Sequence, residues 1–125
     1  MRLSGTLVTA TIGLVLAACG LIRPKPADIL AAEFGPKPTQ EEVLSSVKAH
    51  MSRLLFDPYS AVYECGTARK AWVNLVGKIH YGWAAFCEIN AKNRFGGYVG
   101  ARPYGFMINY GRVTLDGWAN LEFVD

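Results

Sequence analysis

The chain has 125 residues, with 13 lysines and arginines against 10 aspartates and glutamates and two histidines, for a formal net charge of +3. This length leaves room for one domain with a small core. The modest charge gives no reason to expect a nucleic acid as partner, because such partners require a concentrated basic surface.

The first twenty residues have the layout of an export signal. Arg2 supplies a positive charge, residues 7–16 are mostly apolar, and Ala17-Ala18 precede Cys19. One alternative is a transmembrane anchor, but the uncharged stretch 6–22 is only just long enough to span a bilayer and contains several threonines and glycines. Another alternative is a plain secretory signal in which Cys19 is an ordinary cysteine.

The run Leu16-Ala17-Ala18-Cys19 resembles the lipobox of bacterial lipoproteins. The resemblance implies that residues 1–18 are a signal peptide and that Cys19 is lipidated, with two ester-linked chains and usually a third acyl group such as palmitate. Two chains are enough for stable membrane anchoring. By the same resemblance Gly20, in place of an aspartate, favours the outer membrane over the inner membrane, with the protein facing the periplasm.

Residues 19–38 are expected to form a proline-rich tether, and residues 39–125 a single domain. Four prolines alternate with cations in the tether, a composition typical of a semi-rigid spacer, although residues 27–34 could form a short helix.

A capping box at Thr39 and Glu42 predicts the start of an amphipathic helix. Asp57-Pro58 is expected to end it, because the residue before a proline avoids the helical conformation. His50 lies beside the apolar stripe and is interpreted as a partly buried structural histidine rather than a ligand. The stripe itself recurs at helical spacing and consists of Val43, Val47, Met51, Leu54 and Leu55.

After residue 60 the pattern changes to strands, expected at 61–65, 71–76 and 79–90 and in several pieces between 98 and 124. A tight turn is expected at Gly77-Lys78, breaks at Pro103, Gly105 and 109–111, and a hairpin at Asp116-Gly117. The fold class is therefore α+β: one helix packed on one face of an antiparallel sheet of four to six strands. In the third strand the candidates for the buried face alternate and are Ile79, Tyr81, Trp83, Ala85, Cys87 and Ile89.

If Cys19 carries lipid, Cys65 and Cys87 remain as a pair in an oxidising compartment. Strand alternation points Cys87 inward and puts Cys65 on the face of Ala61 and Tyr63, so a structural disulfide is expected. The alternatives are a catalytic thiol or a zinc site. The two histidines show no ligand spacing, so no metal and no cofactor is expected.

The segments 56–61 (FDPYSA) and 87–100 (CEINAKNRFGGYVG) together resemble a set of small secreted bacterial proteins and lipoproteins. In that set a DP-x-SA turn after a helix precedes a C-x-x-NAKN-x-FGGY-x-G pattern. The resemblance implies a shared small α+β domain and no activity. Glu88 and Ile89 depart from it, because relatives often have Gly and Val there.

The second segment is also the candidate ligand site. Amides, cations and rings beside the Gly96-Gly97 turn could bind a carboxylate, a phosphate or a sugar. The candidate residues are Asn90, Lys92, Asn93, Arg94 and Tyr98. The alternative is a polar hairpin in which the asparagines satisfy turn amides while the aromatic rings pack inward.

Catalytic motifs are missing: the chain has neither G-x-S-x-G nor H-E-x-x-H. We therefore expect a non-enzymatic interaction or structural module of the cell envelope, anchored to the membrane, with an envelope protein or peptidoglycan as partner. One alternative is an inhibitor of an incoming hydrolase such as lysozyme. Another is an envelope hydrolase using Glu64, Glu88 or His80, in which the two carboxylates would work as a pair.

Overall fold

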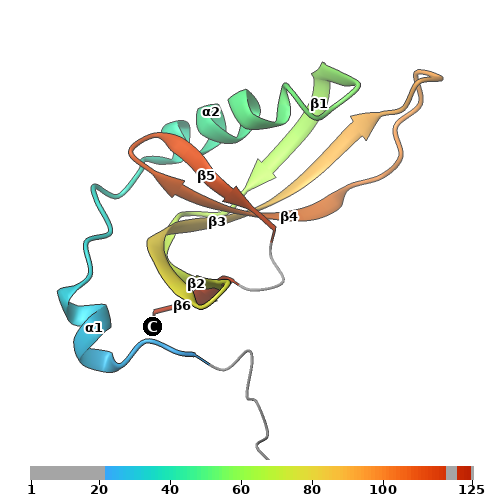
Figure 1. Ribbon diagram of the computed structural model, residues 1–125. Coiled ribbons are helices and arrows are strands. Elements are labelled where there is room, and N and C mark those ends of the chain that lie inside the picture. The colour runs from blue at the N-terminus through green and yellow to red at the C-terminus, as the bar shows by residue number, and fades with distance from the viewer. Residues whose placement is uncertain (1–21, 118–120, 125) are drawn as a thin grey trace, which may run out of the picture.

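The computed structural model describes residues 22–117 and 121–124, so the expected signal peptide and Cys19 lie outside the described residues. Within these ranges the chain forms a pair of helices followed by six strands (Figure 1). The helices are α1 (Pro26–Ala31) and α2 (Gln40–Met51). The strands are β1 (Asp57–Cys65), β2 (Arg69–Leu75), β3 (Lys78–Lys92), β4 (Arg102–Asn109), β5 (Arg112–Asp116) and β6 (Leu121–Phe123).

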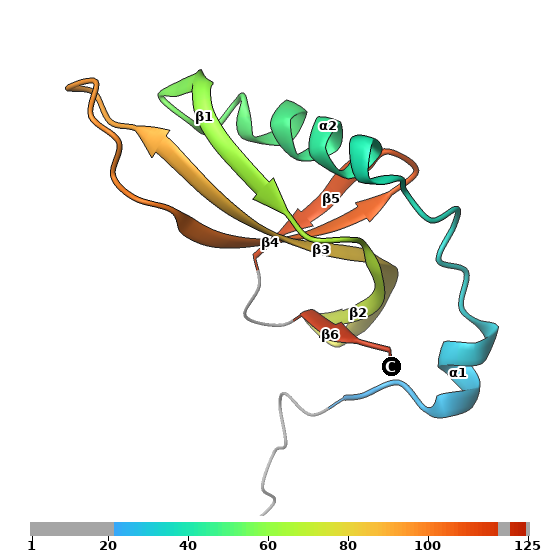
Figure 2. The same ribbon diagram turned by 180° about the vertical axis from the view of Figure 1, so that it is seen from behind.

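All six strands belong to one antiparallel sheet organised around β3. The order is β5-β4-β3-β2-β6, and β1 pairs with the far end of β3. Because β2 pairs with the first half of β3 and β1 with its second half, β1 and β2 follow one another along one edge of β3. Strand β4 occupies the other edge, and the sheet bends strongly along β3 (Figures 1 and 2). The expected antiparallel sheet is confirmed, at the upper limit of the expected strand number.

Helix α2 begins where the capping box predicts. The Thr39 hydroxyl accepts from the Glu42 amide at 3.2 Å, and the Glu42 carboxylate accepts from the Thr39 amide at 2.7 Å. The helix lies along one face of the sheet (Figure 1). Its buried side chains join strand residues in the main core, which contains Val43, Val47, Met51, Ala85, Cys87, Ile89, Phe106 and Ile108.

The end of this helix differs from the expectation. It ends at Met51, six residues before Asp57, and a turn closed by the Leu54 and Leu55 amides on the Met51 carbonyl follows. Leu54 is 61% exposed and does not belong to the buried stripe. Pro58 imposes an extended conformation on Asp57, and β1 starts at this residue. The strand therefore begins three residues before Ser60, where the sequence pattern changes from helix to strand.

The disulfide is confirmed, and the expected buried face of β3 is confirmed in part: Ile79 is only half-buried and lies outside the main core, and Gly82 and Ala84 on the opposite face are buried as well. Trp83, Ala85, Cys87 and Ile89 are buried in the main core, with Tyr81 packed against it. Cys65 stands directly opposite Cys87 in the β1–β3 register, and the two form a disulfide.

Two tight turns join neighbouring strands. The first, at Val76-Gly77, lies one residue before the expected turn at Gly77-Lys78, and the second, at Tyr110-Gly111, lies within the expected break at 109–111. Val76-Gly77 and Tyr110-Gly111 each have positive φ at both residues, the requirement of the hairpin turn that matches strand twist. The expected hairpin at Asp116-Gly117 is wrong: β5 ends at Asp116, and the next strand, β6, pairs with β2 on the far side of β3.

Some of the expected tether packs on the domain. Phe34 is buried in the main core, and the indole of Trp83 donates to the Gly35 carbonyl at 3.1 Å. At the start of the described segment the Arg23 guanidinium pairs with Glu122 at 3.2 Å. The prolines therefore stiffen a segment that lines the fold, and α1 is the short helix that this composition allows.

Candidate functional site

Six of the exposed apolar side chains lie on the segments where β1 starts and where the chain leaves β3. We call this surface the aromatic tip; it consists of Phe56, Tyr59, Val62, Phe95, Tyr98 and Val99. Tyr59 is fully exposed and Phe95 is 96% exposed. Isolated exposed apolar residues need no explanation, but six at one end of a small domain are typical of a contact surface.

Backbone pairing and one side-chain hydrogen bond join the two halves of the tip. Asp57 pairs with Lys92 across β1 and β3, and Lys92 forms a bridge with Tyr98. The Tyr98 hydroxyl donates to the Ser60 carbonyl at 2.8 Å, which fixes the loop after β3 against the start of β1. The tip is therefore one surface built from two distant stretches of sequence.

The asparagines of the candidate ligand site hold the loop in shape. The Asn93 side-chain oxygen accepts from the Phe95 amide at 2.9 Å and from the Gly97 amide at 3.2 Å. The Asn90 side-chain oxygen accepts from the Gly100 amide at 3.1 Å. This agrees with the alternative in which asparagines satisfy turn amides. The rings follow that alternative only in part, because Tyr104 packs against the core whereas Phe95 is exposed to solvent.

The charges of the tip are mainly positive. The Lys92 ammonium lies over the Tyr98 ring at 5.2 Å from its centroid, a favourable cation–π contact. Arg94 is exposed and has no ion-pair partner among the described residues. Asp57 faces the Ser60 hydroxyl and amide and, next, Lys92, and these groups hold the pKa of its carboxyl below the usual value of 3.8. The tip thus combines aromatic rings, cations and the Asp57 carboxylate, which already accepts a hydrogen bond from the Ser60 amide.

The candidate catalytic residues are only partly brought together. Glu64 and Glu88 stand directly opposite each other beside the disulfide, and both are exposed as strand alternation predicts. With Phe86 and Pro103 they line an open hollow of about 450 Å³. His80 lies eight residues before Glu88 on β3, which is roughly 26 Å of extended chain. The two carboxylates are neighbours on one sheet surface, and His80 is not part of that group.

His50 occupies the position expected of a structural histidine. Its ring packs edge-on against Phe106, with centroids 6.0 Å apart, and its Nε2 lies 2.7 Å from the Asp116 carboxylate. Among residues 22–117 and 121–124, no group of three or more histidines, cysteines, aspartates and glutamates is arranged to hold a metal ion. No helix in the same ranges is long and apolar enough to cross a membrane.

Sequence reasoning missed half of the tip. The missed residues are Phe56, Tyr59 and Val62. The aromatic rings of Phe56 and Tyr59 flank or fall within the DP-x-SA motif, and their concentration there was a usable signal. Their meeting with residues 95–99 depends on the β1–β3 pairing, which no local pattern reveals.

The chain was also compared with known proteins: no protein-family model matches it, and no curated protein and no solved structure does either.

Proposed function

We propose that this protein is a lipid-anchored interaction module of the bacterial cell envelope, and that the aromatic tip binds peptidoglycan. The anchor is Cys19, in the outer membrane and facing the periplasm, as the lipobox resemblance implies. The observation that carries the proposal is the position of the tip. Segment 22–25 enters beside β2 and β6, at the end of the molecule opposite the loop after β3 (Figures 1 and 2). A protein held by its N-terminus therefore presents the tip away from its anchor.

The disulfide supports the same compartment. Disulfides persist in oxidising spaces such as the bacterial periplasm and are rare in the cytosol. The Cys65–Cys87 bond lies between β1 and β3, the two strands that lead to the tip. The disulfide thus covalently joins the two strands that carry the aromatic tip.

The chemistry of the tip suits a glycan with acidic peptide stems. Sugar rings expose faces of C–H groups, which pack favourably on the electron-rich faces of aromatic rings. Tyr59 and Phe95 are exposed enough for both ring faces to be reached. The exposed guanidinium of Arg94 can form paired hydrogen bonds with a stem-peptide carboxylate.

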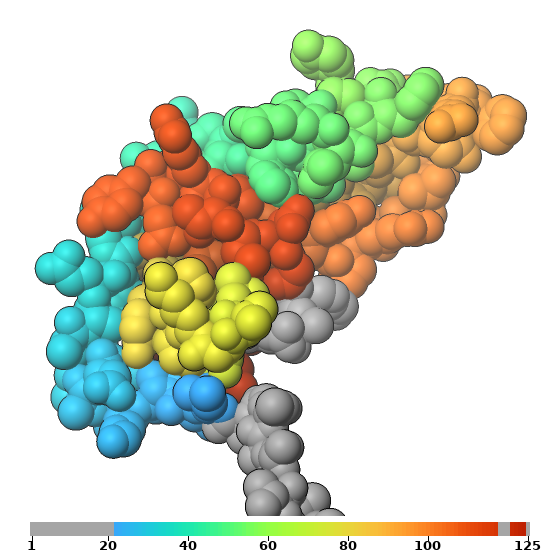
Figure 3. Space-filling model, viewed as in Figure 1, coloured from blue at the N-terminus to red at the C-terminus, as the bar shows by residue number. Residues whose placement is uncertain are grey.

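The same loop favours a second candidate function. Residues 93–100 protrude from the sheet (Figures 1 and 3), and a protruding loop is a shape that can enter an enzyme cleft. Inhibition of a wall hydrolase such as lysozyme is therefore the second candidate. Hydrolysis by Glu64 and Glu88 is less favoured, because the carboxylates stand side by side on one strand pair instead of on two sides of a bound sugar.

Co-sedimentation with purified peptidoglycan sacculi tests the proposal. Wild-type protein should sediment with sacculi. The double variant Tyr59→Ser/Phe95→Ser should bind about tenfold more weakly, since an aromatic contact contributes about 0.5–1.5 kcal/mol beyond area burial. Leu30→Ser is the matched control, because Leu30 is 89% exposed and lies on α1, at the other end of the molecule.

Equal sedimentation of wild type and the tip variant would contradict the assignment of the tip. If wild type does not sediment but inhibits lysozyme through the same two rings, the inhibitor replaces the wall-binding module. Tip-dependent cross-linking to one envelope protein, without sedimentation, would instead identify a protein partner.

A further inference from the structure

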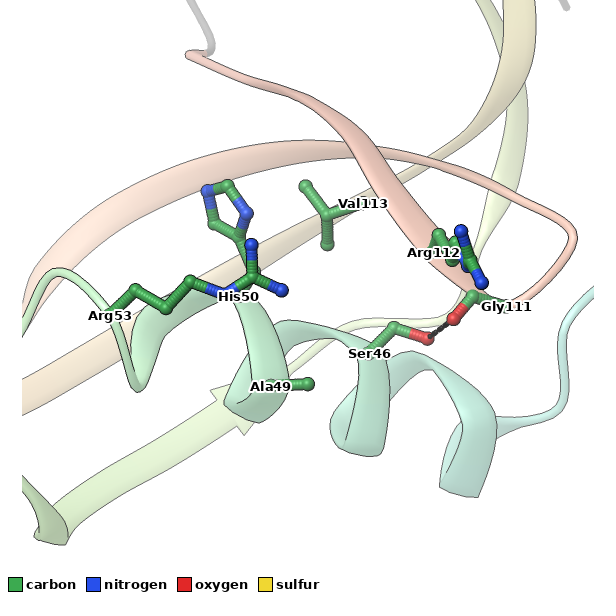
Figure 4. Close-up of a pocket in the computed structure, with 7 residues that line it drawn as sticks. All are labelled: Ser46, Ala49, His50, Arg53, Gly111, Arg112 and Val113. Atoms are coloured by element: carbon green, nitrogen blue, oxygen red, sulfur yellow. Dashed lines mark hydrogen bonds between the residues drawn. The ribbon is translucent and has the colours of Figure 1, made fainter.

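A second hollow lies between α2 and the turn that joins β4 to β5, away from the aromatic tip (Figures 1 and 4). Its volume is about 520 Å³. Ala49, His50 and Arg53 line it from the helix side, and Arg112 and Val113 line it from β5. The Ser46 hydroxyl donates to the Gly111 carbonyl at 2.9 Å, which ties the helix to the hairpin turn at one end of the hollow. We call this hollow the arginine pocket.

The charges around the arginine pocket are unbalanced. Arg53 and Arg112 form no ion pair among the described residues, and the nearby Asp116 carboxylate lies within hydrogen-bond distance of His50 Nε2, at 2.7 Å. Figure 4 shows the two arginines on different sides of the lining, with Ala49 and Val113 between them. Among the described residues the lining holds two guanidinium groups and no carboxylate, so its net charge is positive and attracts an anion.

We propose that the arginine pocket binds the phosphate group of a phosphorylated small molecule or headgroup. Two guanidinium groups match the charge of a phosphate monoester, and each planar fork can form two parallel hydrogen bonds with phosphate oxygens. The volume lies within the usual range of small-molecule sites, about 300–1,000 Å³, and exceeds what a phosphate alone fills. Ala49 and Val113 offer an apolar surface to the carbon portion of the ligand.

This proposal is independent of the aromatic tip. The pocket is formed by α2 and the β4–β5 hairpin, whereas the tip is formed by the start of β1 and the loop after β3. Arg23 therefore serves as a matched control: it is an exposed arginine outside both the pocket and the tip, and losing it should leave phosphate binding unchanged.

The test is calorimetric titration of the full chain with inorganic phosphate and with glycerol phosphate at low salt, where screening is weak. Wild-type protein should bind glycerol phosphate saturably and more tightly than inorganic phosphate or acetate. Arg53→Ala/Arg112→Ala should weaken this binding at least about tenfold, since each lost charge-assisted hydrogen bond is worth a factor of that order. Arg53→Lys/Arg112→Lys should fall between the two, because charge remains and the fork is lost.

Vesicles with and without phosphatidic acid distinguish a lipid headgroup from a soluble ligand. Arginine-dependent binding to vesicles alone supports the proposal with a lipid as the source. The proposal is overturned if wild type binds neither phosphate compound nor phosphatidic acid, if acetate binds as tightly as glycerol phosphate, or if the double alanine variant binds like wild type. Both arginines are exposed, so the variants should unfold at the wild-type temperature, which a thermal scan checks.

Discussion

Removal of the Cys65–Cys87 disulfide should cost a large share of the stability of this domain. The two cysteines are 22 residues apart in sequence, so the bond closes a short loop in the unfolded chain. The loss of chain entropy for a loop of this size corresponds to about 3 kcal/mol at 25 °C. A domain of this size has a total free energy of unfolding of roughly 5–15 kcal/mol. The replacement Cys65→Ala/Cys87→Ala should therefore remove roughly a fifth to three fifths of it.

Urea denaturation followed by circular dichroism measures this effect. With a slope of about 2 kcal/mol per molar urea, the transition midpoint should fall by about 1.5 M in the double variant. Wild type with added reductant should show a similar fall, whereas the double variant should not respond to reductant. All proteins should carry Cys19→Ser, so that this third cysteine cannot exchange with the pair. A wild-type midpoint that reductant leaves unchanged would refute the reasoning.

Three further predictions concern single residues. Gly82→Ala should destabilise the fold by about 1–3 kcal/mol, because an added Cβ would lie 2.6 Å from the Asn109 side-chain oxygen. Gly66→Ala is the control, because its added Cβ would have its nearest contact at 3.6 Å. Equal unfolding midpoints for the two variants would contradict the prediction. Tyr63→Phe should raise the free energy of unfolding by about 1 kcal/mol at neutral pH, because the buried hydroxyl has no hydrogen-bond partner among the described residues. Burial also raises the pKa of Tyr63 above its usual value of 10.0, because the folded state favours the neutral phenol. The free energy of unfolding therefore does not change with the ionisation of Tyr63 below pH 10.0, and it falls as the pH rises from there through the raised pKa. The phenylalanine variant should lose less stability than wild type in alkaline urea titrations, and parallel curves would count against this. Cys19→Ser should release the protein from the membrane fraction on cell fractionation, and continued retention with an uncleaved N-terminus would argue for a transmembrane anchor.

Local patterns in the sequence predicted the elements whose causes are local. The Thr39–Glu42 capping box places the start of α2, because it satisfies amides within one turn. Alternation along β3 predicts its buried face, and with it the inward direction of Cys87. The disulfide followed from that face and from the even number of remaining cysteines.

Long-range pairing explains what local patterns missed. The sequence Asp116-Gly117 has the composition of a hairpin, yet the strand after it pairs with β2, where residues 121–123 are half-buried. An aromatic partner helps to hold β6: the Phe86 and Phe123 rings lie 5.5 Å apart. Nothing near Asp116 in the sequence signals that partner.

The candidate surfaces were harder to predict than the fold for the same reason. Candidate residues 90–98 were found because they cluster in sequence, and the other half of the tip was not named as a site because it precedes them by about thirty residues. The arginine pocket joins α2 to a hairpin some sixty residues later. Arg53 and Arg112 carry no motif, and only the packing of α2 on the sheet brings them to one hollow.

The claim that this protein is anchored to the membrane through lipidated Cys19 is tested most directly by the mass of its N-terminal peptide. The protein should be purified from membranes and its N-terminal fragment analysed by mass spectrometry. The account predicts a fragment that begins at Cys19 and carries a diacylglycerol with or without a third acyl chain. A fragment that begins at Met1, or one in which Cys19 is unmodified, would contradict it.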